Sequence, residues 1–308
     1  MVTPNSRRAF LFGRRAPSTP WGQFCTRLAR MTEGPVHWNQ DAARPQAWLR
    51  PRREADIFHA RALCAEYGVC LALDGTALPA ALLPRGLLWV EPGTDWAELS
   101  AVAGGQGGWR ADGGCRIAAL QDAGVSMLAG IDRSQSVAGW FASRAAADWT
   151  PGAGWRSGVI RVEVLLADGT VATLGPFGAD AREPLDSLTV QQMVPRLFEL
   201  AGAEPARAWA RQAHWPARLR LDVLNPPPGS EVNLAWLLAG HGGCLAWVRT
   251  VWFADSPQAT GFASPGDNPT IPASPTDSAD SETLFAAHTL DQEVKRIVDP
   301  QGVFTPTP

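Results

Sequence analysis

The sequence predicts an α+β fold with two structured parts, and three local patterns support that prediction. Residues 159–174 alternate apolar and polar side chains around an Asp168-Gly169 turn, which indicates a β-hairpin. In residues 47–73 the apolar side chains first follow a strand pattern, then recur at helical spacing, and then form a short apolar run, as expected for a strand, a helix and a second strand. Helical spacing returns over residues 284–297, close to the C-terminus. Both parts of the chain are therefore expected to contain helices.

Length and composition restrict the class of protein. At 308 residues the chain fits two compact domains, and 45% hydrophobic with 19% charged residues is the composition of a globular protein. The formal net charge of −3 gives no reason to expect nucleic acid as a partner. No apolar run approaches the roughly 20 residues that a membrane-spanning helix needs.

The five cysteines are scattered along the chain. No Cys-x-x-Cys pair occurs and no histidine stands at ligand spacing, so we expect no metal site. The odd number of cysteines argues against a complete disulfide framework and favours a reducing compartment. We therefore expect a cytoplasmic protein, which would reach the inner face of the membrane only through its partners.

Residues 1–37 are expected to form a flexible arm that is rich in arginine. Within this arm, Ser6-Arg7-Arg8 is similar to a twin-arginine export motif. The uncharged apolar stretch that should follow such a motif is missing, because further arginines and a proline stand there. An accidental match is the favoured interpretation, and a working export signal is the alternative.

A short apolar run over residues 87–90 ends at a Pro-Gly pair, which predicts a strand and a tight turn. Thr94 or Asp95 can then cap a helix that begins at Trp96. The glycine run at 104–108 stands at the end of that helix and not between a strand and a helix start. We interpret it as a helix cap and turn, and not as a phosphate loop.

Asp74-Gly75-Thr76 is the first candidate for a binding segment. It follows a buried strand predicted over residues 69–73, and glycine at this place lets backbone N–H groups approach a phosphate closely. An aspartate beside a phosphate is repulsive, however. An ordinary Asp-Gly turn is therefore an equal alternative.

Two more candidate segments follow. Residues 136–144 have small side chains at Gly139 and Ser143, which would allow a flat ring system to stack on the backbone. An alanine-rich helix packed on a sheet is the alternative interpretation. The third segment contains Arg156 and Ser157, directly before the first strand of the hairpin.

In this order, the segments resemble the FAD-binding domain of flavoproteins of the vanillyl-alcohol oxidase and p-cresol methylhydroxylase type. The Glu-Pro-Gly turn after residue 90, the small-residue segment, the hairpin and the Asp-Pro-x-Gly-x-Phe ending at 299–304 each resemble a motif of that family. The resemblance implies an α+β FAD-binding domain of the p-cresol methylhydroxylase type with a second, smaller α+β domain. The eroded motifs are most similar to the FAD-binding subunit of bacterial glycolate oxidases.

The resemblance also implies which residues hold FAD. The pyrophosphate would lie against the first two segments, Arg156 would be its charge partner, and Ser157 replaces an aspartate of the family. The strand backbone at Ile160 would read the adenine end. The implied site is Asp74, Gly75, Thr76, Gly139, Ser143, Arg156, Ser157 and Ile160. No catalytic residue is implied.

The order of the motifs divides the chain into four parts. These are the arm at 1–37, the FAD-binding domain at 38–178, a reduced substrate or cap domain at 179–283 with a disordered loop at 257–281, and a C-terminal helix and tail at 284–308 that returns to the FAD domain. In the cap domain, residues 186–200 and 209–215 are expected to be helical, and residues 218–224, 234–238 and 244–252 to be strands. His214 and His241 are its candidates for proton abstraction, although a structural role is more common for a lone histidine.

These features lead to alternative functions. The first is a FAD-binding oxidoreductase subunit that acts on a 2-hydroxy acid, with a larger flavoprotein subunit and an iron–sulfur subunit as partners. The second is a non-catalytic scaffold subunit that kept the fold but lost FAD, which Asp74, Ala138 and Ser157 favour. A small-molecule binder without redox chemistry is a third function that no specific residue supports. The 14 tryptophans favour a hetero-oligomer, because tryptophan is enriched at interfaces.

Overall fold

The computed structural model contains helices and sheets in one compact arrangement, so the predicted α+β class is confirmed. The structure describes residues 19–39, 44–76, 78, 86–93, 95–102, 108–178, 185, 187–226, 231–255 and 281–307. Within these residues, no helix is both long enough and apolar enough to cross a membrane.

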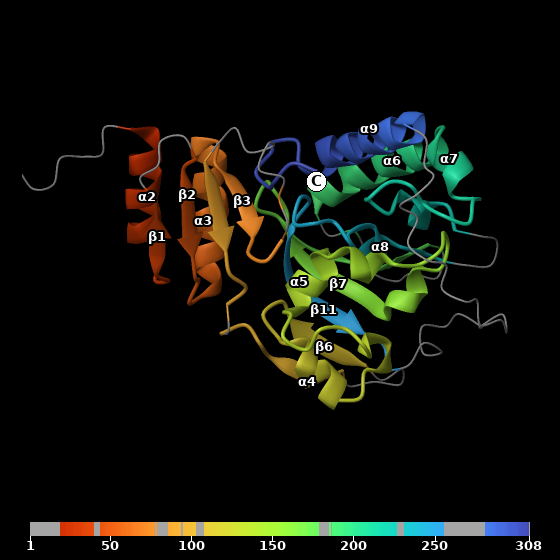
Figure 1. The fold of residues 1–308 in the computed structure, drawn as a ribbon, viewed down its shortest axis with the longest axis horizontal. Coiled ribbons are helices and arrows are strands. Elements are labelled where there is room, and N and C mark those ends of the chain that lie inside the picture. The colour runs from red at the N-terminus through yellow and green to blue at the C-terminus, as the bar shows by residue number, and fades with distance from the viewer. Residues whose placement is uncertain are drawn as a thin grey trace, which may run out of the picture.

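One end of the molecule is a four-stranded sheet covered by two helices (Figure 1). Its strands, in spatial order, are β1 (Val36–Trp38), β2 (Gln46–Leu49), β4 (Leu87–Val90) and β3 (Cys70–Leu73). Strands β2, β4 and β3 run parallel, whereas β1 is an antiparallel edge. Helix α3 (Glu54–Tyr67) connects β2 to β3 as the predicted crossover. The carboxyl ends of β3 and β4 therefore lie at the same edge of this sheet.

Helix α2 (Pro20–Met31) corrects the expectation of a flexible arm over residues 1–37. The Thr19 side chain caps the helix by accepting a hydrogen bond from the Gly22 N–H at 3.1 Å. Phe24 and Leu28 are fully buried, and α2 packs against α3. Three apolar residues at helical spacing were enough to order this segment, although the arginines around them suggested disorder. Ser6-Arg7-Arg8 lies outside the described residues.

The second sheet has five antiparallel strands. In spatial order they are β5 (Leu99–Ala101), β6 (Trp109–Asp112), β11 (Trp247–Phe253), β7 (Val159–Leu165) and β8 (Val171–Leu174). Strands β7 and β8 form the predicted hairpin. Residues 99–101 are a strand and not the helix expected from Trp96, because they pair with β6. The glycine run at 104–108 lies largely outside the described residues.

The remaining elements are short, apart from two helices. They are α4 (Ile117–Asp122), η2 (Ser126–Leu128), α5 (Val137–Ala142), η3 (Arg144–Ala147), η4 (Gly154–Ser157), β9 (Pro176–Phe177), α6 (Leu188–Gly202), α7 (Ala206–Trp209), η5 (Leu221–Leu224), β10 (Val232–Asn233), α8 (Leu234–Leu237) and α9 (Ser281–Val298). Helices α6, α7 and α9 lie together on the other side of the molecule from β1 (Figure 1). Helix α6 packs against both α9 and η5.

The structure also corrects the boundaries of the expected cap domain at 179–283. Strand β11 is the central strand of the five-stranded sheet, between β6 and β7, and does not belong to a second sheet. Residues 221–224 and 234–237 are helical turns where strands were expected. Nearly every residue between 233 and 248 is buried, so apolar runs there give no periodicity that separates a strand from a helix. The expected loop at 257–281 lies almost entirely outside the described residues.

The last residues of the chain lie against the parallel sheet. Leu71 donates its N–H to the Val303 carbonyl oxygen at 2.7 Å, and Phe304 forms a parallel bridge with Leu71. The buried Asp299 carboxylate accepts hydrogen bonds from the backbone N–H groups of Val303 and Phe304 and pairs with Lys295. The Asp-Pro-x-Gly-x-Phe ending is therefore a folded anchor, in which the aspartate fixes the turn and the phenylalanine enters the core.

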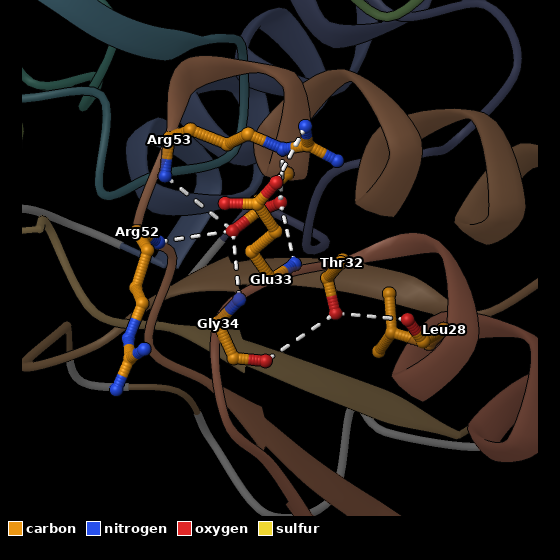
Figure 2. A network of polar contacts seen from close by, with 7 residues as sticks. Leu28, Thr32, Glu33, Gly34, Arg52 and Arg53 are labelled. Carbon is orange, nitrogen blue, oxygen red and sulfur yellow. Dashed lines mark hydrogen bonds and ion pairs between the residues drawn. The ribbon is translucent and has the colours of Figure 1, made fainter.

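A buried carboxylate joins α2 to the start of α3. Asp56 has no exposed surface and accepts backbone N–H donors from Glu33 at 3.0 Å and from Gly34 and Arg52 at 2.9 Å each. Figure 2 shows these donors and the Arg53 side chain, whose Nε also donates to Asp56. Burial alone would raise the pKa of Asp56, but the backbone donors outweigh it and lower the pKa below the ordinary value.

We expect Asp56→Asn to destabilise the protein by about 2–3 kcal/mol, because an amide offers one acceptor oxygen to three backbone donors and the Arg53 Nε. Urea unfolding at neutral pH measures this loss. The difference between wild type and variant should shrink below about pH 4, since a carboxylate with a lowered pKa loses its stabilising effect as the pH falls through that pKa. Asp122→Asn, at an exposed ion pair with Arg133, is the control and should change stability by less than about 0.5 kcal/mol.

Candidate functional site

The carboxyl end of β3 carries the first predicted segment. Gly75 has a φ of +84°, and a Cβ at that position would meet no atom within 4 Å. Asp74 is exposed and donates its N–H to the Val90 carbonyl of β4 at 2.9 Å. The Thr76 hydroxyl donates to the Leu73 carbonyl at 2.7 Å, which closes the turn. The segment is thus a tight turn with an open face at its glycine.

Helix α5 carries the second predicted segment. Ser136 caps the helix, accepting a hydrogen bond from the Gly139 N–H at 3.0 Å. Ser143 ends it, and its hydroxyl donates to the Trp140 carbonyl at 2.6 Å. Trp140 and the neighbouring residues of α5 are buried, so the helix also has the packing role of the alternative interpretation.

A glycine-rich turn at 240–243 joins these two segments, and the sequence analysis did not identify it. Gly240, Gly242 and Gly243 have φ angles of +74°, +68° and +77°, a conformation that favours glycine. Gly240 and Gly242 donate their N–H groups to the last residues of α5, Phe141 and Ala142, at 2.8 and 2.7 Å. This turn therefore lies directly against the end of α5.

The same turn also contacts the end of β3. A Cβ on Gly243 would lie 3.5 Å from the Leu73 Cβ and 3.6 Å from the Thr76 Cγ2. The structure thus brings Thr76 and Ser143 to a common turn. The Gly-His-Gly-Gly run at 240–243 was the available signal in the sequence, where it stands between two expected strands.

Two backbone donors remain in this cluster. Among the described residues, the N–H groups of Gly75 and Gly243 have no hydrogen-bond partner. The N–H groups of Asp74, Thr76 and Gly139 are already bonded within the protein. Two N–H groups in glycine turns of positive φ are a suitable, although small, set of donors for a phosphate oxygen.

His241 is held neutral inside the turn. Its side chain is buried, and burial together with the charges of Arg218 and Lys295 lowers its pKa to about 3. Its Nδ1 lies 3.5 Å from the Leu245 N–H, whereas Nε2 has no partner in the described part of the chain. A histidine with this pKa is a weak base, which argues against proton abstraction here. The other candidate, His214, is exposed.

Arg156, Ser157 and Ile160 form a separate group at the start of β7. Arg156 is exposed and its guanidinium lies over the Trp155 ring. The Ser157 hydroxyl is buried and donates to the Gly154 carbonyl at 2.8 Å. In the described part of the chain, no hydrogen bond or ion pair connects Arg156 to the glycine turn. The element that contains Arg156 and Ser157, η4, contacts η3 at the end of the second segment, but among the described residues the Arg156 side chain itself makes no polar contact with the turn.

Protein side chains already donate hydrogen bonds to the strand carbonyl groups that were expected to bind the adenine. The Asn233 amide donates to the Ile160 carbonyl at 2.9 Å, and the buried Trp236 indole donates to the Val159 carbonyl at 2.7 Å. The Trp236 ring also packs so closely on Gly154 that a Cβ there would lie 2.6 Å from it. A nucleotide at this strand would have to share these carbonyl groups with two protein side chains.

A separate cleft of about 180 Å³ lies between α3 and the five-stranded sheet. Its charged groups are paired with one another, Arg249 with Glu163 at 2.8 Å and Arg110 with Asp112 at 3.1 Å. Burial raises the pKa of Glu163 in spite of the nearby Arg110. None of the predicted site residues lines this cleft.

The sequence matches no protein-family model and no curated protein. Solved structures show a partial likeness. The chain is 13% identical to Physcomitrella patens BBE-like 1, with a TM-score of 0.42 over 75% of this chain and 44% of the other. It is 14% identical to 4-ethylphenol oxidase from Gulosibacter chungangensis, with a TM-score of 0.43 over 78% of this chain and 43% of the other. It is 11% identical to 6-hydroxy-D-nicotine oxidase from Arthrobacter nicotinovorans, with a TM-score of 0.41 over 72% of this chain and 42% of the other. The chain spans less than half the length of these proteins, and a likeness at this level assigns no activity to it.

We expect His241 to make the protein sensitive to mild acid. Its folded-state pKa lies below the unfolded value of about 6.5, so the unfolded chain binds the proton first and stability falls as the pH drops from 6.5 towards 3. Between about pH 7 and pH 5, urea unfolding should show wild type losing about 2 kcal/mol more than His241→Gln. His214→Gln, at an exposed histidine, should keep the wild-type slope; equal slopes for all three proteins would contradict the assignment.

Proposed function

We propose that this protein is a FAD-binding oxidoreductase subunit. The observation that supports this best is the meeting of three turns: the end of β3, the end of α5 and the glycine turn at 240–243. Two of these turns were expected to hold FAD from their sequence, and the third was found only in the structure. FAD supplies the redox chemistry, whereas the described residues of this cluster would bind and orient it.

The residues of this cluster fit the diphosphate of FAD better than its adenine. The N–H groups of Gly75 and Gly243 are available as donors, and glycine at both positions lets an anion approach the backbone. The exposed carboxylate of Asp74 opposes an anion. The adenine would have to lie away from Val159 and Ile160, since their carbonyl groups already accept hydrogen bonds from the protein.

We also propose the finer assignment that the sequence suggested, a glycolate-oxidase-like complex acting on a 2-hydroxy acid. In that assignment a larger flavoprotein subunit and an iron–sulfur subunit are the partners, and the complex works in the cytoplasm, at the inner face of the membrane. Within the described cluster, His241 is too buried and too weakly basic to take the substrate proton. We therefore assign the substrate chemistry to a partner subunit and cofactor binding to this chain.

Replacing Gly243 tests the placement of FAD. We expect wild-type protein, incubated with FAD and passed through gel filtration, to retain flavin absorbance. Gly243→Val should retain at least about tenfold less, because a β-branched residue is strained at a φ of +77° and its side chain would press on Thr76. Gly130→Val is the control: it has a φ of +85°, but its Cβ meets open space away from the cluster.

Two outcomes are distinct. Flavin in wild type and in the control, but not in Gly243→Val, supports the site. Equal flavin in all three proteins means that FAD binds elsewhere. Circular dichroism must show that both variants are folded before flavin contents are compared.

A scaffold subunit without FAD is the alternative that a specific observation favours. Asn233 and Trp236 fill the strand backbone at the expected adenine end, and Asp74 stands where an anion would lie. If wild-type protein retains no flavin after incubation with excess FAD, this alternative replaces the first proposal.

Association with partners can be tested in the native host. We expect sizing chromatography of a native extract, followed by immunodetection, to place this chain in a particle clearly larger than its own 33.0 kDa. Recombinant protein alone is the control for self-association. A native elution volume equal to that of the 33.0 kDa monomer would contradict the complex.

A further inference from the structure

Two arginines beside the glycine turn lack carboxylate partners. Among the described residues, neither Arg144 nor Arg218 forms an ion pair. The Arg218 Nε is buried without a hydrogen-bond partner in that part of the chain. The Arg144 side chain makes one long hydrogen bond, 3.4 Å, to the Ala217 carbonyl. Arg144 is exposed and Arg218 is half-buried, so the buried Arg218 Nε without a partner is the costly group, and an anion between the two guanidinium groups would complete it.

Both arginines lie close to the turn. A Cβ on Gly242 would lie 2.7 Å from the Arg218 Nη2, so that guanidinium packs on the glycine backbone. A Cβ on Gly240 would lie 3.5 Å from the carbonyl oxygen of Ser143, the residue before Arg144. The Arg218 side chain thus contacts the turn, and the Arg144 side chain lies next to that segment because it donates to the carbonyl of Ala217, the residue before Arg218.

The other charges nearby are already engaged. Arg220 forms a buried pair with Asp222, at 2.7 Å, and Lys295 pairs with Asp299. Asp291 is the carboxylate nearest in the fold to Arg218, but its oxygens accept the backbone N–H groups of Arg218 and Leu219 at 3.0 and 2.8 Å. Asp291 therefore holds the backbone of this segment and forms no ion pair with the Arg218 guanidinium.

Electrostatics agree with this geometry. Burial lowers the pKa of both Arg144 and Arg218, and the charge of Arg218 lowers that of Arg144 further. Arg218 and Lys295 also add to the burial that lowers the pKa of His241. Cys244 beside them has its pKa raised to about 12 by burial, so it supplies no negative charge near neutral pH. The charge of Asp291 acts in the opposite direction on both arginines, so the turn is surrounded by Arg144, Arg218 and Lys295 with one buried carboxylate among them.

We propose that Arg144, Arg218 and the glycine turn at 240–243 form a binding site for a phosphate-type oxyanion. Two guanidinium groups can each offer a planar pair of donors, which suits phosphate oxygens, and the Gly243 N–H adds a backbone donor. The natural source of the oxyanion is the diphosphate of a dinucleotide if the proposed function holds, and a free phosphorylated metabolite if it does not. Arg144 and Arg218, and not Arg156, are then the charge partners of the anion.

Inorganic pyrophosphate is the probe that separates this site from the rest of FAD. We expect isothermal titration of the full-length protein to show pyrophosphate binding, and its affinity to fall at least about tenfold in Arg218→Gln and in Arg144→Gln. Arg218→Lys keeps the charge but not the planar donors and should bind with intermediate affinity. Arg211→Gln, at an exposed arginine of the same segment, is the matched control and should bind like wild type.

The outcomes separate this site from the proposed function. If pyrophosphate does not bind to wild type, or binds equally to both glutamine variants, the site is wrong. If Arg218→Gln does not fold, Arg144→Gln against the Arg211→Gln control decides. FAD that displaces pyrophosphate from wild type identifies a dinucleotide as the source. If pyrophosphate binding needs the arginines but the protein retains no FAD, the site is supported and the proposed function is wrong. If wild type and both glutamine variants retain FAD equally, the proposed function stands and the site is wrong.

Discussion

A four-residue turn with three left-handed glycines brings the ends of β3 and α5 together. Strand β3 ends on one side of the turn, α5 ends on the other, and β11 begins four residues after it. The backbone of the turn donates to α5, and Gly243 leaves only van der Waals space for Leu73 and Thr76. A side chain at any of the three glycines would strain the backbone, and at Gly240 or Gly242 it would also press on Ala147 or Arg218. The candidate site exists because this close approach is possible.

Apolar spacing and turn residues predicted the elements that have one buried face or end at a glycine. The hairpin at 159–174 alternates clearly and has an Asp-Gly turn, and α3 shows helical spacing that ends at Gly68, which has a φ of +64°. The region from 233 to 248 was misassigned because it is buried on all sides, so its apolar run had no period. Strand β5 was missed because three residues paired to β6 carry no pattern of their own. Its structure is set by the partner strand.

Only part of the candidate site could likewise be predicted from the sequence. Gly75, Thr76, Gly139 and Ser143 were found because a turn after a strand, and a helix of small residues, are visible in the sequence. The turn at 240–243, which contacts Thr76 and the Ser143 backbone, lies far from both segments along the chain, and only the fold brings it there. Arg218 is also distant from both segments in sequence. Arg156 was chosen by the resemblance alone, and the structure shows it exposed over Trp155 instead.

Tryptophan shows how far composition can be used to infer association. Trp140, Trp209, Trp215, Trp236 and Trp247 are among the tryptophans that are less than a tenth exposed. Trp38 and Trp48, on neighbouring strands of the parallel sheet, are the large exposed ones among the described residues, each at 41%. Most of the 14 tryptophans therefore stabilise the core of this chain, and their number does not by itself indicate an interface. A partner that uses tryptophan contacts would have to meet the open side of β1 and β2, because the rest of the indole surface is largely covered by the chain itself.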